Sequence, residues 1–439
     1  MTFEQEQDKL LNSFMERTFF TAWKYPERVE ENPIFYGNYK QLELNLSPHC
    51  DLNCTYCYLN KHSEEFYPTE AIKTDNILKN TSMLLDWLYK NDYRPSLEFF
   101  SGDPLVQNTG HELIELVIKK AKEYGRPLSN YLSIPTNMGV LFFPDKLERL
   151  ERNMAEAEKL GFKIGLSASV DGPYMEENRP SKGKTVRDEK FYDNLFRFAK
   201  KYGIGFHPMI YSNNIEKWKD NFLWFQENFK KYELPWWNIY LLEVRNWEWS
   251  EAQAKEFYNF LYWLVHWTWE QCGKDIKSFS RGYFNIMGAV LATTGRGIGC
   301  SIQSSLQLRV GDLTWGPCHR LMYEKFDTGY FEVKNDEIVG IKARNVETYL
   351  AINSGNTSNF PECESCALNQ FCSAGCLGAN YETTGDLFNT NPAVCRLEHY
   401  KAAAIFHALN DLGILSYIVS RFNEPRRNAV LNLINNKII

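Results

Sequence analysis

The chain has 439 residues, of which 44% are hydrophobic and 15% aromatic, so it can bury a large core and suits a main domain with appendages. Its formal net charge of −6 and the lack of a basic face argue against nucleic-acid binding. Residues 1–10 are polar, and charged residues interrupt every long apolar stretch, so we expect a cytoplasmic protein without a signal peptide or a membrane contact.

Residues 41–246 alternate between strand-like and helix-like segments. Short apolar runs predict the strands, and apolar residues at helical spacing predict the helices between them. The predicted strands cover 41–47, 96–101, 131–135, 163–170, 204–211 and 237–244, and the predicted helices cover 77–88, 112–122, 145–160, 191–201 and 215–229. This alternation predicts a parallel sheet covered by helices, either an open doubly wound sheet or a curved partial barrel. In both, the active site lies at the carboxyl ends of the strands.

The remaining segments are less regular. Residues 1–40 form an extension without a motif, and a long helix rich in Trp and Tyr at 251–273 dominates a helical bridge at 247–299. From about 280, Gly, Ser, Asn and Cys become frequent, which is typical of a segment ordered by bound clusters rather than by a large core. Residues 401–439 return to helix as a C-terminal tail.

Eleven cysteines in a chain expected in a reducing cytosol indicate metal binding rather than disulfides. Three of them form the motif Cys50-x3-Cys54-x2-Cys57 directly after the first predicted strand. A structural zinc site needs four ligands, and His62 could complete this set, so zinc is one alternative. Three thiolates also suit a cubane cluster with one iron left open for a cofactor.

With Tyr56 and Tyr58 beside its third cysteine, the motif resembles the signature of the radical S-adenosylmethionine superfamily. The resemblance implies a [4Fe–4S] cluster on Cys50, Cys54 and Cys57 that binds S-adenosylmethionine and donates the electron that cleaves its sulfonium. The resulting 5′-deoxyadenosyl radical takes a hydrogen atom from the substrate, while the protein supplies binding and orientation. A one-electron reductant such as a flavodoxin or a ferredoxin is then a partner.

The same resemblance implies a partial (β/α)6 barrel at 41–246, with cofactor contacts at successive strand ends. One segment reads Ser-Gly-Asp-Pro where the family usually has Gly-Gly-Glu-Pro, so the shorter acid Asp103 would accept from the cofactor ammonium. Arg179 is a candidate carboxylate partner because guanidinium pairs bidentately with carboxylates. Singly, each segment would also fit a turn or a cap. The implied contacts are Tyr56, Ser101, Gly102, Asp103, Pro104, Thr136, Asn137, Ser167, Ser169, Asp171 and Arg179.

A second group of cysteines follows, with the spacing Cys300-x17-Cys318, Cys363-x2-Cys366-x5-Cys372-x3-Cys376 and then Cys395. The pattern resembles the SPASM domain of radical enzymes that act on peptides and proteins, which implies such a domain at 300–400 with two auxiliary [4Fe–4S] clusters. The outer cluster would use Cys363, Cys366, Cys372 and Cys395, and the inner one Cys300, Cys318 and Cys376. Cys272 is either a distant fourth inner ligand or an ordinary buried thiol. A zinc knuckle at 363–376 is the alternative.

We therefore predict a radical maturase that installs a thioether, a carbon–carbon crosslink or a related modification on a ribosomally made peptide or a protein. Sulfatase-maturing enzymes resemble the chain but carry Asp directly after the cysteine that matches Cys318. This chain has His319 at that position. We expect His319 to hydrogen-bond a cluster sulfur. Such oxidation of a protein residue is one alternative, and a zinc-stabilised binding protein is another. About forty residues rarely fold alone, so leader recognition would need a separate leader-binding protein, the aromatic 230–270 region or the C-terminal helix.

Overall fold

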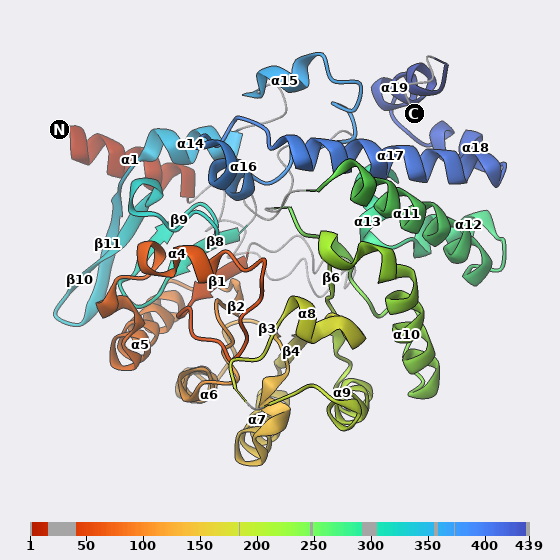
Figure 1. The fold of residues 1–439 in the computed structure, drawn as a ribbon. Coiled ribbons are helices and arrows are strands. Elements are labelled where there is room, and N and C mark those ends of the chain that lie inside the picture. The colour runs from red at the N-terminus through yellow and green to blue at the C-terminus, as the bar shows by residue number, and fades with distance from the viewer. Residues whose placement is uncertain are drawn as a thin grey trace. The chain divides into compact units, whose positions relative to one another are not determined.

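The computed structural model describes residues 2–15, 41–183, 185–245, 249–291, 305–354, 359–372 and 374–435 (Figure 1). The chain divides into two compact units, each built from several segments. The first unit contains Met1–Ser169, Arg179–Phe198 and Ser301–Ser354, and the second contains Val170–Asn178, Ala199–Cys300 and Gly355–Ile439. The segment at 300–400 thus contributes residues to both units.

A helix-covered β-sheet forms the first unit. Four parallel strands lie in the order β1 (Gln41–Asn45), β2 (Ser96–Phe100), β3 (Tyr131–Thr136) and β4 (Lys163–Ala168). The connecting helices are α5 (Thr74–Lys90), α6 (Asn108–Glu123) and α7 (Pro144–Lys159). Each helix buries one apolar stripe, which on α5 includes Ile77, Leu84, Leu85 and Leu88. These elements confirm the predicted alternation of parallel strands and helices.

Four more strands extend this sheet beyond β1. Strand β8 (Ser305–Arg309) pairs in parallel with β1, and β9 (Thr314–Gly316), β10 (Gly329–Lys334) and β11 (Glu337–Ala343) follow antiparallel. The expectation of an irregular segment after about 280 was wrong here. Asn335 and Asp336 form the two-residue turn between β10 and β11, with positive φ values of 51° and 59°. Asn and Asp favour such hairpin turns, so this pair was the signal in the sequence for the hairpin.

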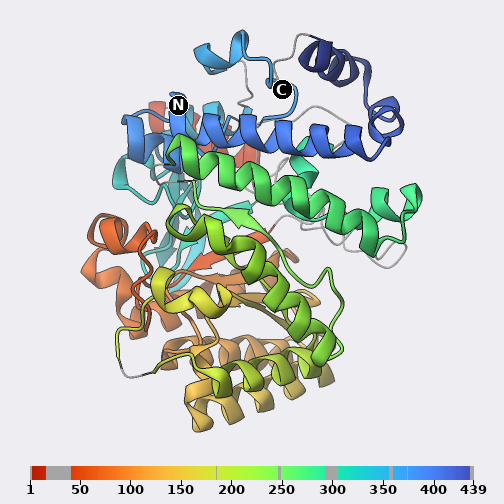
Figure 2. The same ribbon diagram turned by 45° about the vertical axis from the view of Figure 1, so that its right-hand side comes forward.

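Helices dominate the second unit. Helix α11 (Glu251–Gln271) begins with a capping box of Ser250 and Gln253, and α17 (Pro392–Asp411) begins at a cap by Asn391. The two helices run side by side in Figure 2, and α10 (Trp218–Lys231) belongs to the same unit. The last two predicted strands are reduced to the fragments β5 (Gly205–Phe206), β6 (Met209–Ile210) and β7 (Leu242–Glu243).

The other helices are shorter, and α9 (Glu189–Tyr202) contributes residues to both units. They are α1 (Phe3–Met15), α4 (Leu59–Phe66), α8 (Met175–Asn178), α12 (Ile276–Gly282), α13 (Asn285–Leu291), α14 (Val346–Ser354), α15 (Pro361–Glu364), α16 (Leu377–Thr384), α18 (Leu415–Ser420) and α19 (Glu424–Asn435). Among the residues that the structure describes, no helix combines the length and the apolar character that a membrane crossing requires.

Candidate active site

The first three cysteines lie in the loop that directly follows β1. A separate segment fixes this loop, since Asn53 N donates to Pro180 O at 2.8 Å and Lys182 N donates to Asp51 O at 2.7 Å. Inside the loop, Cys57 N donates to Cys54 O at 3.1 Å. The loop is therefore held at several backbone positions without any contribution from a bound group.

The chemistry of these thiols fits an iron–sulfur cluster. Burial above all, then the charge of Asp103, raises the pKa of Cys50 far above the ordinary thiol range, and Cys54 is close enough to add to the effect. Such a thiol keeps its proton until a metal replaces it. In the described part of the chain, no three His, Cys, Asp or Glu side chains converge on the position of a single ion. Three thiolates suit a cubane cluster with one iron left open, as the sequence predicts.

His62, the fourth ligand of the zinc alternative, contacts a carboxylate and an aromatic ring. The Nδ1 atom of His62 lies 3.2 Å from Glu65 Oε1, and the imidazole ring stacks on Phe66 with the ring centres 5.8 Å apart. A carboxylate therefore engages one ring nitrogen of His62, and the packing of the ring fixes its orientation.

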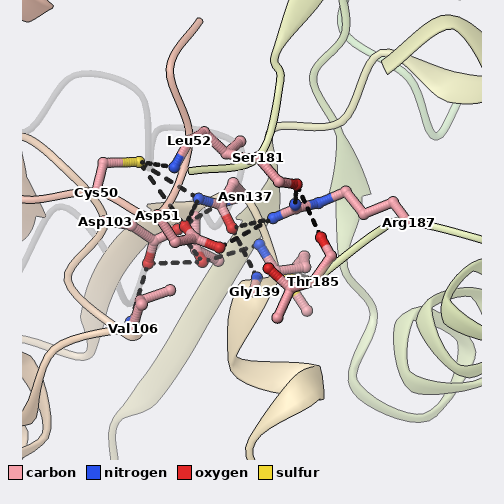
Figure 3. A network of polar contacts seen from close by, with 12 residues as sticks. Cys50, Asp51, Leu52, Asp103, Val106, Asn137, Gly139, Ser181, Thr185 and Arg187 are labelled. Atoms are coloured by element: carbon pink, nitrogen blue, oxygen red, sulfur yellow. Dashed lines mark hydrogen bonds and ion pairs between the residues drawn. The ribbon is translucent and has the colours of Figure 1, made fainter. Parts of the chain in front are cut away.

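Asn137 connects the cysteine loop to the end of β3 (Figure 3). Its Nδ2 donates to Asp51 Oδ1 at 2.6 Å and to Cys50 Sγ at 3.5 Å, while its Oδ1 accepts from Gly139 N at 2.7 Å. Leu52 N is a second donor to Cys50 Sγ, at 3.4 Å. Donors to a ligand sulfur stabilise its thiolate and orient it toward a metal.

Arg187 completes this network, and the sequence analysis missed it. Its Nη2 donates to Asn137 Oδ1 at 2.9 Å and lies 3.4 Å from Asp51 Oδ2, and its Nη1 donates to Ser181 Oγ at 3.1 Å. The side chain is fully buried. No local pattern marks this residue, because its partner Asn137 is 50 positions away in the sequence.

Asp103 lies at the junction of β2 and β3, where protein donors surround its carboxylate. Oδ1 accepts from Leu105 N at 3.0 Å and from Val106 N at 3.2 Å, Oδ2 accepts from Asn137 N at 2.7 Å, and Thr136 Oγ1 lies within 3.1 Å of both oxygens. Burial, then the charge of Asp51, raises the pKa of Asp103 to about 6. The carboxylate thus ties two strand ends together, and its contact with a cofactor ammonium stays a prediction.

The turn before Asp103 packs tightly against the cysteine loop. A Cβ atom on Gly102, which has φ +58°, would lie 2.1 Å from His49 O, so only glycine fits there. Ser101 adopts φ 73°, a left-handed conformation that glycine occupies more easily, and its Oγ donates to Asn45 Oδ1 at 3.0 Å. Pro104 continues the turn, and Asp103 N donates to His49 O at 2.8 Å. Serine at position 101, where the family usually has glycine, therefore adopts a backbone conformation that is less favourable for serine than for glycine.

The predicted contacts near β4 fall in both units. In the first unit, Ser169 N donates to Thr136 O at 2.7 Å, and the guanidinium of Arg179 lies 5.4 Å from the ring centre of Tyr56. Ser167 lies on the same strand face as Ser169. Asp171 belongs to the second unit, where its Oδ1 accepts from Met209 N at 2.9 Å.

His319 contacts a carboxylate on β1. Its Nδ1 lies 3.1 Å from Oε1 of the buried Glu43, and its ring stacks between Phe100 and Tyr58, with centre distances of 4.5 and 5.8 Å. Glu43 thus engages one ring nitrogen of His319, and Cys318 Sγ accepts from Arg320 N at 3.4 Å.

Comparison with known proteins adds independent evidence. No family model matches the chain. The radical SAM cyclopropyl synthase TigE of Paramaledivibacter caminithermalis is 23% identical over 419 residues, which cover 89% of this chain and 81% of TigE. The chain is thus similar over most of its length to a radical S-adenosylmethionine enzyme. The solved structure of anSMEcpe with bound AdoMet and Cp18Cys peptide has the same fold, with a TM-score of 0.55, 17% identity and coverage of 85% of this chain and 99% of that chain.

Four of the later cysteines, Cys363, Cys366, Cys372 and Cys395, belong to the second unit. Burial, then Cys395 and Cys366, raises the pKa of Cys363 to about 11. Cys395 also contributes to the pKa of Cys372, which burial above all raises to about 12. His399 Nε2 lies 3.7 Å from Cys366 Sγ. The charges of the four thiols predicted for an outer cluster therefore act on one another.

The cysteines predicted for an inner cluster are described less completely. Cys300 lies outside the described residues, while Cys318 belongs to the first unit and Cys376, which precedes α16, to the second. Cys272 follows the last turn of α11. The first turn of α11 lies beside α17 near Arg396, and the 21 residues of the helix span about 30 Å. Cys272 therefore lies at the opposite end of α11 from that contact with α17.

Proposed function

We propose that this enzyme takes a hydrogen atom from a side chain of a ribosomally made peptide or a protein and thereby installs a thioether, a carbon–carbon crosslink or a related modification. The spacing of Cys363, Cys366, Cys372 and Cys395 carries this proposal, since SPASM cysteine patterns are typical of radical enzymes that act on peptides. The relatives support it, because anSMEcpe was solved with AdoMet and a peptide and TigE is a cyclopropyl synthase.

In this proposal, Cys50, Cys54 and Cys57 hold the [4Fe–4S] cluster, which supplies an electron to S-adenosylmethionine when bound. Asn137 and Arg187 orient the loop that carries these cysteines. Because protein donors already occupy the Asp103 carboxylate, the backbone of the Ser101–Pro104 turn would bind the cofactor ammonium, and Asp103 would hold that turn in place.

The other cofactor contacts follow from the same arrangement. Ser167, Ser169 and Asp171 would bind the ribose, and Arg179 would bind the cofactor carboxylate from its position over Tyr56. Thr136 contributes indirectly, because its hydroxyl donates to Asp103 and its carbonyl fixes Ser169.

Two auxiliary [4Fe–4S] clusters complete the proposal. Cys363, Cys366, Cys372 and Cys395 would hold the outer one, and Cys300, Cys318 and Cys376 the inner one. The fourth inner position would fall to Cys272, to a non-cysteine side chain or to the substrate. A peptide thiolate matches a soft iron site well, and binding there would place the substrate for reaction. A flavodoxin or ferredoxin would reduce the enzyme, and a separate protein would bind the leader.

Sulfatase-type oxidation of a protein residue is not favoured. His319 replaces the aspartate that serves as base in those enzymes, and Glu43 engages its Nδ1 atom.

A direct test of the proposed function uses a short peptide encoded beside this gene, incubated anaerobically with the reconstituted enzyme, S-adenosylmethionine and a reductant. We expect the peptide to lose two hydrogen atoms by mass spectrometry, with equivalent 5′-deoxyadenosine. Turnover with a small molecule but with no encoded peptide would contradict the proposal.

A further inference from the structure

One row of polar side chains crosses four strands of the first unit. In the register of the parallel sheet, Glu43 on β1 pairs with Glu98 on β2 and with Gln307 on β8. Glu98 in turn pairs with Ser133 on β3. Such partners point to the same face of a sheet. We call Gln307, Glu43, Glu98 and Ser133 the polar row, and all four belong to the first unit.

The polar row lies on the face of the sheet opposite helix α6. The leucines that alternate with it, Leu97 and Leu132, line a small cavity together with Val117 of α6, so the apolar face packs against that helix. On the face of the row, Glu98 is only half-buried, and the side chain of His319 is 26% exposed. The row is therefore partly open to solvent.

The polar row combines two carboxylates with few compensating charges. Glu43 Oε1 accepts from Asn45 Nδ2 at 3.3 Å and lies 3.1 Å from His319 Nδ1. Gln41 Nε2 donates to Glu98 Oε2. Within the described part of the chain, neither carboxylate forms an ion pair with a lysine or an arginine. A single imidazolium would neutralise only one of the two charges.

Gln307 gives independent evidence that the row lacks a donor. Its side chain is 1% exposed, and its Oε1 atom has no hydrogen-bond partner among the residues that the structure describes. A buried acceptor without a partner destabilises a folded protein, so such groups are rare. Arg309, two residues further along β8, does not supply the donor, because Asp312 and Asp327 engage its guanidinium.

The two carboxylates of the row also repel each other. Neighbouring strands are about 4.8 Å apart, so side chains in register lie close together. Burial above all, then the charge of Glu43, raises the pKa of Glu98 above its ordinary value, although hydrogen bonds from Ser133 and Gln41 oppose the shift. A cation between the carboxylates would cancel this repulsion and could donate to Gln307 as well.

We propose that the polar row is a subsite for a cationic side chain, a lysine or an arginine of the peptide that this enzyme modifies. Ammonium and guanidinium groups carry only donors, which match two carboxylates and the free acceptor of Gln307. The row lies two residues, about 7 Å, along β1 from Asn45, which accepts from Ser101 in the turn assigned to the cofactor. A cation held there would fix the position of the peptide beside the cofactor. The inference rests on the proposed function, because it names part of the peptide.

The first measurement needs no peptide. The reconstituted full chain with S-adenosylmethionine is titrated with butylammonium chloride, which copies the end of a lysine side chain, and with the uncharged butan-1-ol, by saturation-transfer nuclear magnetic resonance. We expect butylammonium to bind and butan-1-ol to bind much more weakly. Glu98→Gln should weaken butylammonium binding about tenfold. Glu158→Gln, which removes an exposed carboxylate from α7, is the control and should change nothing.

The second measurement uses the short peptide encoded beside this gene. Its lysines and arginines are replaced one at a time by norleucine. We expect one replacement to raise KM about tenfold in the unmutated enzyme and to have little effect in Glu98→Gln, because the charge that it addresses is then gone. Acetylation of the peptide N-terminus should leave KM unchanged, which distinguishes a side chain from the terminal amine.

The outcomes separate the two proposals. If butylammonium binds as expected but the encoded peptide is not modified, the proposed function fails while cation binding by the row stands. Equal butylammonium binding by Glu98→Gln and the unmutated chain, or binding by neither, would overturn the subsite. A modified peptide whose KM responds to none of the replacements would overturn it too. If Glu98→Gln does not fold, Gln307→Leu must show the loss of butylammonium binding.

Discussion

The two cysteine groups of this enzyme are held in different ways. The loop with Cys50, Cys54 and Cys57 follows a buried strand, and side chains from neighbouring strand ends fix it. Cys363 lies on α15, a four-residue helix without a single buried residue. The first loop is therefore ordered by the sheet, whereas we propose that a bound cluster orders the segment around Cys363. We conclude that cluster loss affects chemistry at the first group and folding at the second.

The largest expected effect comes from Cys54→Ala. The first cluster would lose a thiolate, so we expect no detectable formation of 5′-deoxyadenosine from S-adenosylmethionine, while the thermal unfolding of the protein stays nearly unchanged. The matched control is Cys272→Ala at the C-terminal end of α11, which removes a thiol outside the first motif and should retain 5′-deoxyadenosine formation. Release of 5′-deoxyadenosine by Cys54→Ala at the unmutated rate would reject the assignment of this ligand.

Cys372→Ala should have the converse effect. We expect the variant to keep part of its S-adenosylmethionine cleavage but to lose product formation, because the segment at 359–376 loses the cluster that orders it. Hydrogen exchange should rise in that segment and remain low in β1–β4. Cys363→Ala should behave in the same way. Full turnover in either variant would mean that the outer cluster is absent or unnecessary.

Arg187→Met tests how much the network prepares the first loop. The change removes charge-assisted hydrogen bonds to Asn137 and Asp51 inside the protein, each worth about 1.5–3 kcal/mol. We expect a lower free energy of unfolding and slower cluster reconstitution, both measurable without substrate. Arg197→Met, which removes an exposed ion pair on α9, is the control. Equal reconstitution rates in the two variants would show that the loop does not need the network.

Asp103→Asn should give the smallest effect. An amide group would place a donor against Asn137 N or Thr136 Oγ1, which disturbs the turn that we assign to the cofactor ammonium. The lost charge-assisted contacts should cost about 1.5–3 kcal/mol, or roughly tenfold to a hundredfold in affinity for S-adenosylmethionine. Calorimetry on the reconstituted enzyme can measure it. An unchanged dissociation constant would show that Ser101–Pro104 is only a turn.

Local sequence patterns predicted one part of the fold and missed another. The strands β1 to β4 and the helices between them have clear apolar periodicity, and both cysteine groups have distinctive spacing. The sheet extension from β8 to β11 was missed because its frequent turn residues obscured short strands. Local residue spacing does not reveal which segments, distant in the sequence, pair in the fold. Glu43 and His319 are 276 positions apart, and Lys401 and Glu243 are 158 apart, so only the fold identifies these pairs.

The most direct test of the central claim combines iron analysis with product analysis on the anaerobically reconstituted enzyme. The account predicts a brown protein with about twelve irons per chain, four for each of three cubane clusters. It also predicts 5′-deoxyadenosine formation from S-adenosylmethionine and a reductant, lost together with about four irons when Cys50, Cys54 and Cys57 are all replaced by Ala. A colourless protein that binds only zinc and leaves S-adenosylmethionine intact would contradict the account.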